Sequence, residues 1–238
     1  MAKKIVIASG KGGVGKTSVT ICLGKALADE GKKVLLIDCD TLRSIDILLG
    51  ADENIVYNWG DVIRGRCNME DAIYNAGEVD LMTCPRDYMG VNIKSMRDFM
   101  TKLDPLYDYI LLDSPAGLEM GFIAASYVSD KGLVVSTPDP VCVRSACQAA
   151  EEMKKYGVKN IRLVINSAIR SEIKKNRMLN IDKVIDLTEI QLIGVVPEDE
   201  CIRHASMGKP IFSKDNISYK AFTNIAKRID GHYVPLHI

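Results

Sequence analysis

The chain has 238 residues, 47% of which are hydrophobic, and its 31 Lys and Arg residues balance 31 Asp and Glu residues. This length suits one well-buried core, so we predict a single domain over residues 1–238. The balanced charge excludes a global basic field for nucleic acid and an acidic solvating tail, so a charged partner must meet a local patch.

Short runs of Val, Ile and Leu alternate with longer segments of helical character along the chain. Near-continuous apolar runs are typical of strands that are buried on both faces of a sheet. The alternation predicts an α/β fold with a doubly wound, predominantly parallel sheet flanked by helices. The charged segment 169–177 reads as a surface loop or the start of a helix. We predict strands at 5–8, 33–38, 79–84, 109–113, 132–137, 161–166 and 190–197, and helices at 18–30, 93–103, 142–156 and 219–229.

The first predicted strand runs into the sequence GKGGVGKT, residues 10–17, which fits the pattern G-x-x-x-x-G-K-[ST] in full. Glycines let backbone N–H groups wrap a polyphosphate, and the following helix adds its positive N-terminal end. Lys16 is expected to reach the β and γ phosphates, and the Thr17 hydroxyl to bind Mg²⁺. We therefore predict an ATP/ADP site at Gly10, Lys11, Gly12, Gly13, Val14, Gly15, Lys16, Thr17 and Ser18.

A second lysine, Lys11, is not required by the general P-loop. The sequence GKGGVGKT resembles the deviant Walker A loop of the MinD/ParA family of dimeric ATPases. The resemblance implies a P-loop NTPase fold and an ATP-dependent homodimer, in which Lys11 reaches the nucleotide of the partner subunit. Lys11 and Lys16 are then expected to act in catalysis.

Two acidic residues leave the second predicted strand in the sequence KVLLIDCD, and alternate residues of a strand point to one face. By the same resemblance this segment is switch I, with Asp38 near the metal and Asp40 orienting or activating the attacking water. Asp113 ends the strand YILLD in a Walker B pattern and can hold Mg²⁺, and Gly117 follows in switch II. The predicted metal set is Thr17, Asp38 and Asp113.

Two further segments resemble those that line adenine in this family. Asn166 ends the strand IRLVIN, and Pro197, Glu198 and Asp199 follow the last predicted strand. An Asn side chain offers a donor and an acceptor to a purine edge, although Asn is also common in turns. The sequences DSPAG and VPED match the MinD branch more closely than the plasmid-partition branch.

The resemblance has departures that concern partners. MinD proteins usually end in a short amphipathic helix that binds membrane, but Gly231 and Pro235 interrupt the sequence NIAKRIDGHYVPLHI, so no such tail is seen. Ser145 stands where the family often has an aspartate in the helix that contacts MinC-type partners. A protein partner or activator is expected without being identified, and membrane association stays open. The basic residues near the last predicted helix are too few to predict nucleic-acid binding: Lys209, Lys214, Lys220, Lys227 and Arg228.

The chain has seven scattered cysteines and no CxxC pair, signal sequence or apolar run that could span a bilayer. We expect reduced, mostly buried thiols and a cytoplasmic protein, with peripheral association at the inner face of the membrane allowed by the resemblance. Trp59, the only tryptophan, is expected to pack in a small helix, with a reporter of the nucleotide site as the alternative.

The predicted function is that of a MinD-like ATPase, which hydrolyses ATP to ADP and phosphate to time association with a partner or surface. Cell-division site placement or related positioning is the expected role. The alternatives are a nucleotide-gated maturation or metal-delivery ATPase of the carbon monoxide dehydrogenase accessory type, and a flagellar-number regulator, because these share the core motifs.

Overall fold

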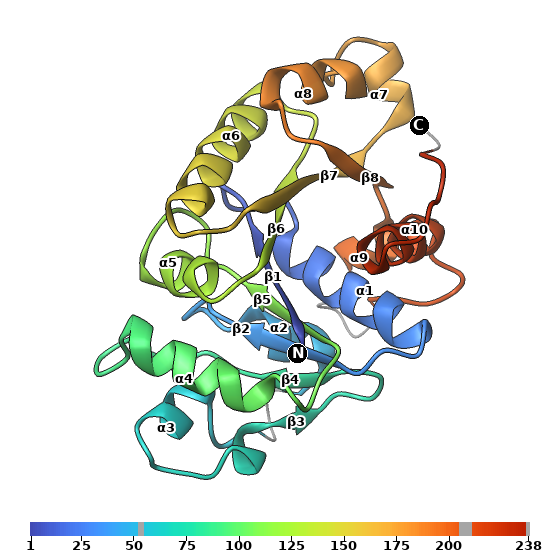
Figure 1. The fold of residues 1–238 in the computed structure, drawn as a ribbon. Coiled ribbons are helices and arrows are strands. Elements are labelled where there is room, and N and C mark those ends of the chain that lie inside the picture. The colour runs from blue at the N-terminus through green and yellow to red at the C-terminus, as the bar shows by residue number, and fades with distance from the viewer. Residues whose placement is uncertain (52–54, 205–210, 237–238) are drawn as a thin grey trace.

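The computed structural model describes residues 1–51, 55–204 and 211–236. Within these residues one eight-stranded sheet has the order β3-β4-β2-β5-β1-β6-β7-β8 (Figure 1). β3 pairs antiparallel with β4, and the other neighbouring strands pair in parallel. The strands are β1 (Lys3–Ala8), β2 (Val34–Asp38), β3 (Tyr74–Asn75), β4 (Asp80–Met82), β5 (Tyr109–Asp113), β6 (Lys131–Ser136), β7 (Asn160–Ala168) and β8 (Leu192–Pro197).

Helices cover both faces of this sheet, which confirms the predicted doubly wound α/β class (Figure 1). α1 and α10 lie together on one face, and α4, α5, α6 and α8 lie on the other. The helices are α1 (Lys16–Asp29), α2 (Ser44–Leu49), α3 (Trp59–Ile63), α4 (Ile93–Leu103), α5 (Met120–Tyr127), α6 (Pro140–Lys155), α7 (Arg170–Lys174), α8 (Ile181–Thr188), α9 (Glu200–Arg203) and α10 (Tyr219–Asp230), with a 3₁₀ turn at Glu70–Ala72.

Each of the seven predicted apolar runs forms a strand, because continuous Val, Ile and Leu side chains can be buried on both faces of the sheet. The prediction missed β3, which has two residues and lies at the sheet edge. It also missed α5 and α8, each of eight residues, and placed the start of α1 at residue 18 instead of Lys16. The charged segment 169–177 contains a short helix, α7.

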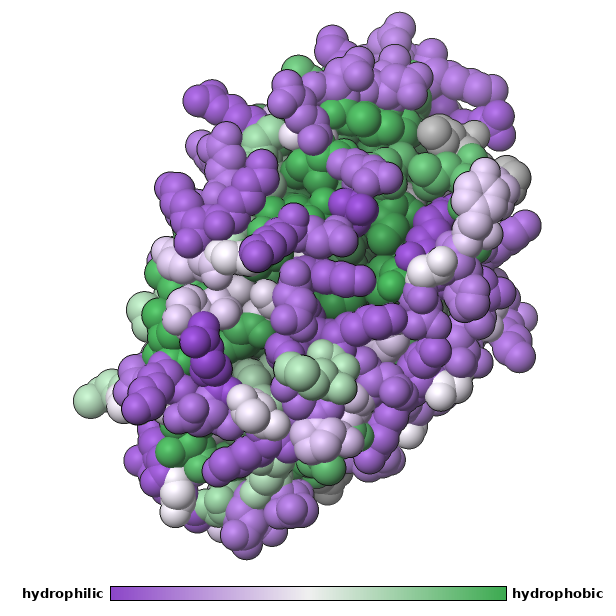
Figure 2. Space-filling view, viewed as in Figure 1, coloured by the Kyte–Doolittle hydropathy of each residue, from purple (hydrophilic) through white to green (hydrophobic). Residues whose placement is uncertain are grey.

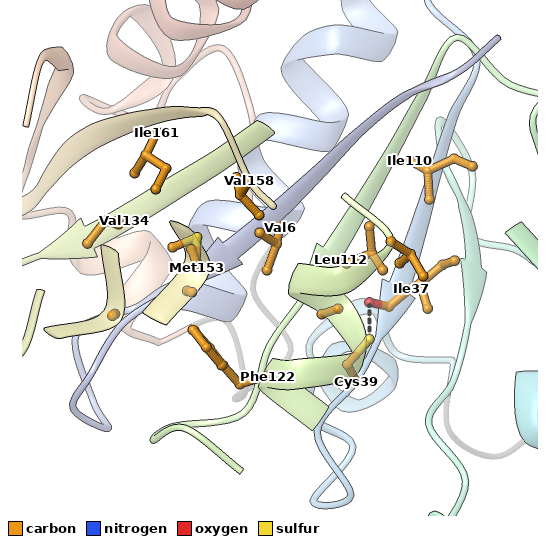
Figure 3. Close-up of a cluster of buried hydrophobic side chains, with 14 of the residues drawn as sticks. Val6, Ile37, Cys39, Ile110, Leu112, Phe122, Val134, Met153, Val158 and Ile161 are labelled. Atoms are coloured by element: carbon orange, nitrogen blue, oxygen red, sulfur yellow. Dashed lines mark hydrogen bonds between the residues drawn. The ribbon is translucent and has the colours of Figure 1, made fainter. Parts of the chain in front are cut away.

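Alternate residues of the central strands enter two separate hydrophobic clusters, one on each face of the sheet. Ile5 and Ile7 pack toward α1 and α10, whereas Val6 and Ala8 pack toward α5 and α6. Figure 3 shows the second cluster, in which Phe122 and Met153 lie beneath the strands. The two buried faces fix the sheet between its helices, so the loops at the carboxyl ends of the strands have a rigid base.

The helix α10 ends at Asp230, where Gly231 takes a left-handed conformation with φ of 102°. This confirms the expected interruption at Gly231. The guanidinium of Arg228 then donates to the carbonyls of Val234 and Pro235 at 2.9 and 2.7 Å, and to the Ile193 carbonyl of β8 at 2.8 Å. The following segment, residues 231–236, is therefore held against the sheet. Across the described ranges, no helix has the length and apolar character needed to cross a membrane.

Candidate nucleotide-binding site

The loop of residues 9–15 joins β1 to α1 at the carboxyl edge of the sheet, and it contains Lys11 and leads directly into Lys16. Gly13 and Gly15 have φ angles of 79° and 89°, a left-handed conformation that disfavours other residues. Gly15 is the N-cap of α1, and the helix starts at Lys16. The loop therefore places free backbone N–H groups and a helix N-terminus at one point, as an anion site requires.

Two glycines of this loop are in close contact with neighbouring elements. A side chain at Gly10 would collide with the backbone carbonyl of Ser145 in α6, and one at Gly15 would collide with the Asn166 amide. The Asn166 amide nitrogen donates to the Val14 carbonyl at 2.9 Å. Asn166, which was predicted to contact adenine, thus links the P-loop to the end of β7 through its amide nitrogen. Its amide oxygen takes no part in that hydrogen bond.

The hydroxyl of Thr17 donates to one carboxylate oxygen of Asp113 at 2.7 Å. Thr20, one helical turn later, donates to the other oxygen at 3.0 Å. Both carboxylate oxygens are therefore held by α1, and the predicted Walker B residue faces the predicted magnesium hydroxyl. Sequence reasoning missed Thr20, although its three-residue spacing from Thr17 would have placed both on one helix face.

Asp38 lies beside Asp113, because β2 and β5 pair in parallel with these two residues in register. Both carboxylates are buried, with exposed fractions of 0% and 1%. Burial raises the pKa of Asp113 to about 6, against the hydrogen bond from Thr17 and the charge of Lys16. Burial and the neighbouring Asp113 raise the pKa of Asp38 well above its usual range.

Lys16 and Asp40 lie next to the carboxylates of Asp38 and Asp113. Lys16 is buried, which lowers the pKa of its ammonium group, while the charges of Asp113 and Asp40 act in the opposite direction. The backbone N–H of Asp40 donates to Asp38 at 2.8 Å. The structure thus brings Lys16, Asp38, Asp40 and Asp113 to one end of the sheet, as the sequence predicted.

The side chain of Lys11 is exposed and makes no hydrogen bond or ion pair with any described residue. The Lys11 backbone carbonyl accepts a hydrogen bond from the Ser9 hydroxyl at 2.7 Å, which fixes the loop but leaves the ammonium group in solvent. The half-buried Asp40 carboxylate accepts from the Leu42 N–H at 3.0 Å. Lys11 is therefore available to a group outside this chain.

A cleft of about 340 Å³ brings the P-loop together with the predicted adenine segments. Glu198 forms an ion pair with Arg203. Burial alone would raise the pKa of Asp199, but hydrogen bonds from Ser218 and Cys201 outweigh burial and lower that pKa. The Asp199 carboxylate therefore holds α9 and the start of α10 in place. The cleft is lined by Gly13, Gly15, Ser18, Leu48, Asn166, Ser167, Pro197, Glu198, Asp199, Ile202 and Arg203.

Gly117 lies in the loop between β5 and α5 with φ of 92° and does not line this cleft. Its loop instead approaches the P-loop through Ala116, whose Cβ would lie 3.6 Å from a Cβ built on Gly12. The sequence gave no sign that Ala116 lies near the P-loop, and Ser145 was singled out only for a partner contact, because both contacts depend on how separate elements pack. Leu48 and Ile202 were missed for the same reason.

Trp59 is buried and packs against Tyr88 with ring centroids 5.5 Å apart, which confirms the predicted packing in a short helix. Its indole N–H also donates to the Asp38 backbone carbonyl at 2.8 Å. The Tyr88 hydroxyl donates to the Cys39 carbonyl at 2.6 Å. Both aromatic residues thus support the backbone of the segment that carries Asp38 and Asp40.

Of the seven cysteines, all are free thiols, and Cys22, Cys39, Cys84 and Cys142 are buried. Burial raises the pKa of the Cys39 thiol well above its usual range. The four buried thiols serve as small apolar side chains, which agrees with the predicted mostly buried thiols.

A predominantly parallel sheet with a two-lysine glycine loop, a helix N-terminus and two buried carboxylates at its carboxyl edge defines a P-loop nucleotide-binding protein. A family model described as an AAA domain matches residues 2–171. The septum site-determining protein MinD of Bacillus subtilis strain 168 is 37% identical over 249 residues, which covers 100% of this chain and 92% of that protein.

Two solved structures extend the similarity to the whole fold. The MinD of a MinC:MinD cell division protein complex from Aquifex aeolicus is 33% identical with a TM-score of 0.91, covering 100% of this chain and 99% of that one. MinD from Pyrococcus horikoshii OT3, complexed with Mg-ADP, is 30% identical with a TM-score of 0.86, covering 97% of each chain. The chain belongs to the MinD/ParA family of P-loop ATPases, in its MinD branch.

Proposed function

We propose that this chain is a MinD-like ATPase that binds Mg-ATP, dimerises on ATP and hydrolyses it to ADP and phosphate. The cycle would time association with a partner or surface in cell-division site placement. The observation that carries this is the contact between Thr17 of the P-loop and the buried Asp113, because it joins the phosphate loop to the acidic pair. The full-length similarity to septum site-determining proteins supports the division role over the maturation and flagellar alternatives.

The oxygen groups of Thr17, Asp38 and Asp113 fit Mg²⁺, which prefers hard oxygen ligands. Burial raises the pKa of both neighbouring carboxylates, and the charge of Asp113 adds to the shift at Asp38. A divalent cation would offset the burial of these negative charges. When bound, Mg²⁺ neutralises charge on the phosphates. A relative solved with Mg-ADP gives further support.

In the proposed reaction the P-loop N–H groups and Lys16 hold the phosphates of ATP. Asp40 orients a water whose oxygen bonds to the γ phosphorus in line, while the bond to the bridging oxygen breaks and leaves ADP. The water's protons pass to phosphate and solvent. Asn166, Pro197 and Glu198 line the region offered to the base, since they share a cleft with the P-loop.

A second subunit would supply Lys11, which is exposed and unpaired among the described residues. Exposed apolar side chains follow the site segments: Leu42 after Asp40, Leu118 and Met120 after Asp113, and Val141 in the first turn of α6. Their exposed fractions are 80%, 39%, 47% and 58%. Contact between two such faces would bury them and bring each Lys11 toward the other nucleotide.

The test is the solution mass of the protein with Mg-ADP, with Mg-ATP, and with Mg-ATP after Lys11→Ala, together with the rate of phosphate release. We expect a dimer with ATP, a monomer with ADP, and loss of the ATP dimer in Lys11→Ala. Lys33→Ala is a matched control, since Lys33 lies at the opposite end of β2. A monomer under every condition would refute the dimer cycle, and Asp40→Ala hydrolysing at the parental rate would refute the role of Asp40.

A further inference from the structure

A second cavity lies behind the nucleotide cleft, between the edge strand β8, the short helix α7 and the first turn of α8. Its volume is about 420 Å³. Cavities of about 300–1,000 Å³ are typical of sites that accept small molecules. None of the residues predicted for catalysis or metal binding lines it.

The walls of this cavity are mostly apolar. Ile173 comes from α7, Ile181 from α8 and Val195 from β8, and all three pack against the hydrophobic core. Figure 2 shows hydrophobic side chains reaching the surface around β7 and β8, below α8. A ligand that fills this cavity must therefore present an apolar body.

Two cations stand at the same cavity. Arg170 and Lys174 both line it and are four residues apart on α7, so they share one face of that helix. Among the described residues neither has an ion-pair partner, whereas the neighbouring Lys175 and Arg177 both pair with Glu172. Asp182 is the carboxylate in the lining, so positive charge is in excess. A ligand with an anionic head would match this charge.

The cavity and the nucleotide cleft share a wall. Pro197 lines both, while at the end of β7 Asn166 and Ser167 line the cleft and Ala168 lines the second cavity. Ser167 has φ of 54°, a left-handed conformation that costs energy for a residue other than glycine. The Glu198 N–H donates to the Ala168 carbonyl at 3.2 Å and ties the two parts of the wall together. A displacement of this wall in the cavity would therefore also displace the residues that line the nucleotide cleft.

We propose that this cavity binds a single-chain anionic amphiphile. The acyl chain lies over Ile173, Ile181 and Val195, and the carboxylate or phosphate head pairs with Arg170 and Lys174. The shared wall couples its occupancy to nucleotide affinity, and by linkage ADP changes the affinity for the amphiphile by the same factor.

The test is calorimetric titration of the full chain with dodecanoate below its micelle concentration. Acetate tests the head alone, and dodecyltrimethylammonium tests the chain with the opposite charge. We expect dodecanoate to bind, acetate not to bind, and the cationic amphiphile to bind at least about tenfold more weakly. Equal binding of the two amphiphiles would overturn the assignment of an anionic head.

Two double variants, matched in the charge they remove, locate the site. Arg170→Gln with Lys174→Gln should weaken dodecanoate binding by about tenfold or more, whereas Lys175→Gln with Arg177→Gln should leave it unchanged. Equal effects of the two pairs would overturn the site. Binding to phosphatidylglycerol vesicles without binding of monomeric dodecanoate would overturn the single-chain assignment. An ADP affinity unchanged by saturating dodecanoate would overturn the coupling.

Discussion

Asp38 and Asp113 end two adjacent parallel strands in register, so two buried carboxylates lie side by side next to the P-loop. Burial favours the protonated form of both, and the charge of Asp113 adds to this effect at Asp38. The nucleotide-free protein therefore carries an electrostatic cost at neutral pH that a bound cation would remove. This arrangement leads to a prediction about pH.

Asp113→Asn should stabilise the nucleotide-free protein at about pH 7.5, by about 1–3 kcal/mol. The folded-state pKa of Asp113 is about 6, above an ordinary value of about 3.9. The folded protein therefore binds a proton at Asp113 more tightly than the unfolded chain does. The stability that this protonation contributes is fully present below about pH 4 and is lost as pH rises through about 6. The measurement is urea unfolding of both proteins across this range, and a stability difference that does not vary with pH would contradict the prediction.

Thr17→Ala should remove the dependence of ATP affinity on Mg²⁺, because the hydroxyl that faces Asp113 is the proposed metal ligand. Thr20→Ala is the control, since it removes a second hydrogen bond to Asp113 without removing that ligand. We expect Thr20→Ala to cost about 1 kcal/mol of stability and to keep the Mg²⁺ dependence. The measurement is the ATP affinity of each variant with Mg²⁺ and with a chelator. An equal loss of the Mg²⁺ dependence in both variants would argue against a metal role for Thr17.

Gly10→Ala should destabilise the protein by about 1–3 kcal/mol, because the new methyl group meets the Ser145 backbone and one of the two elements must move. Gly12→Ala is matched in chemistry, and its nearest neighbour would be Ala116 at 3.6 Å, an ordinary contact. Thermal unfolding without nucleotide compares the two variants. Equal unfolding temperatures would mean that α6 does not press on the loop as described.

The fluorescence of Trp59 should change when Mg-nucleotide binds, because its indole N–H holds the Asp38 carbonyl. The chain has one tryptophan, so the signal needs no labelling. ADP with Mg²⁺ should shift the emission, ADP with a chelator should shift it less, and Trp59→Phe supplies the background. An emission spectrum identical in all nucleotide states would show that the Asp38 segment does not respond to the metal.

The local pattern of the sequence was enough for the fold class and the P-loop. Runs of Val, Ile and Leu require burial on both sides, which in this chain only a helix-covered parallel sheet provides. The glycines at positions 13 and 15 allow the left-handed backbone that the loop needs. Short elements such as β3 and α9 were not predicted, since their few residues carry little periodicity and form through tertiary contacts.

By itself, the sequence determined which residue types follow or end the strands: Lys16 and Thr17 at the start of the helix after β1, Asp38 at the end of β2 and Asp113 at the end of β5. Only the tertiary structure decided which of these groups touch, because strand order and register place β2 and β5 side by side although they lie far apart in the chain. The tertiary structure also decided that Asn166 donates a hydrogen bond to the Val14 carbonyl and Trp59 donates one to the Asp38 carbonyl. Such contacts depend on the packing of whole helices and strands, and no local pattern of residues encodes them.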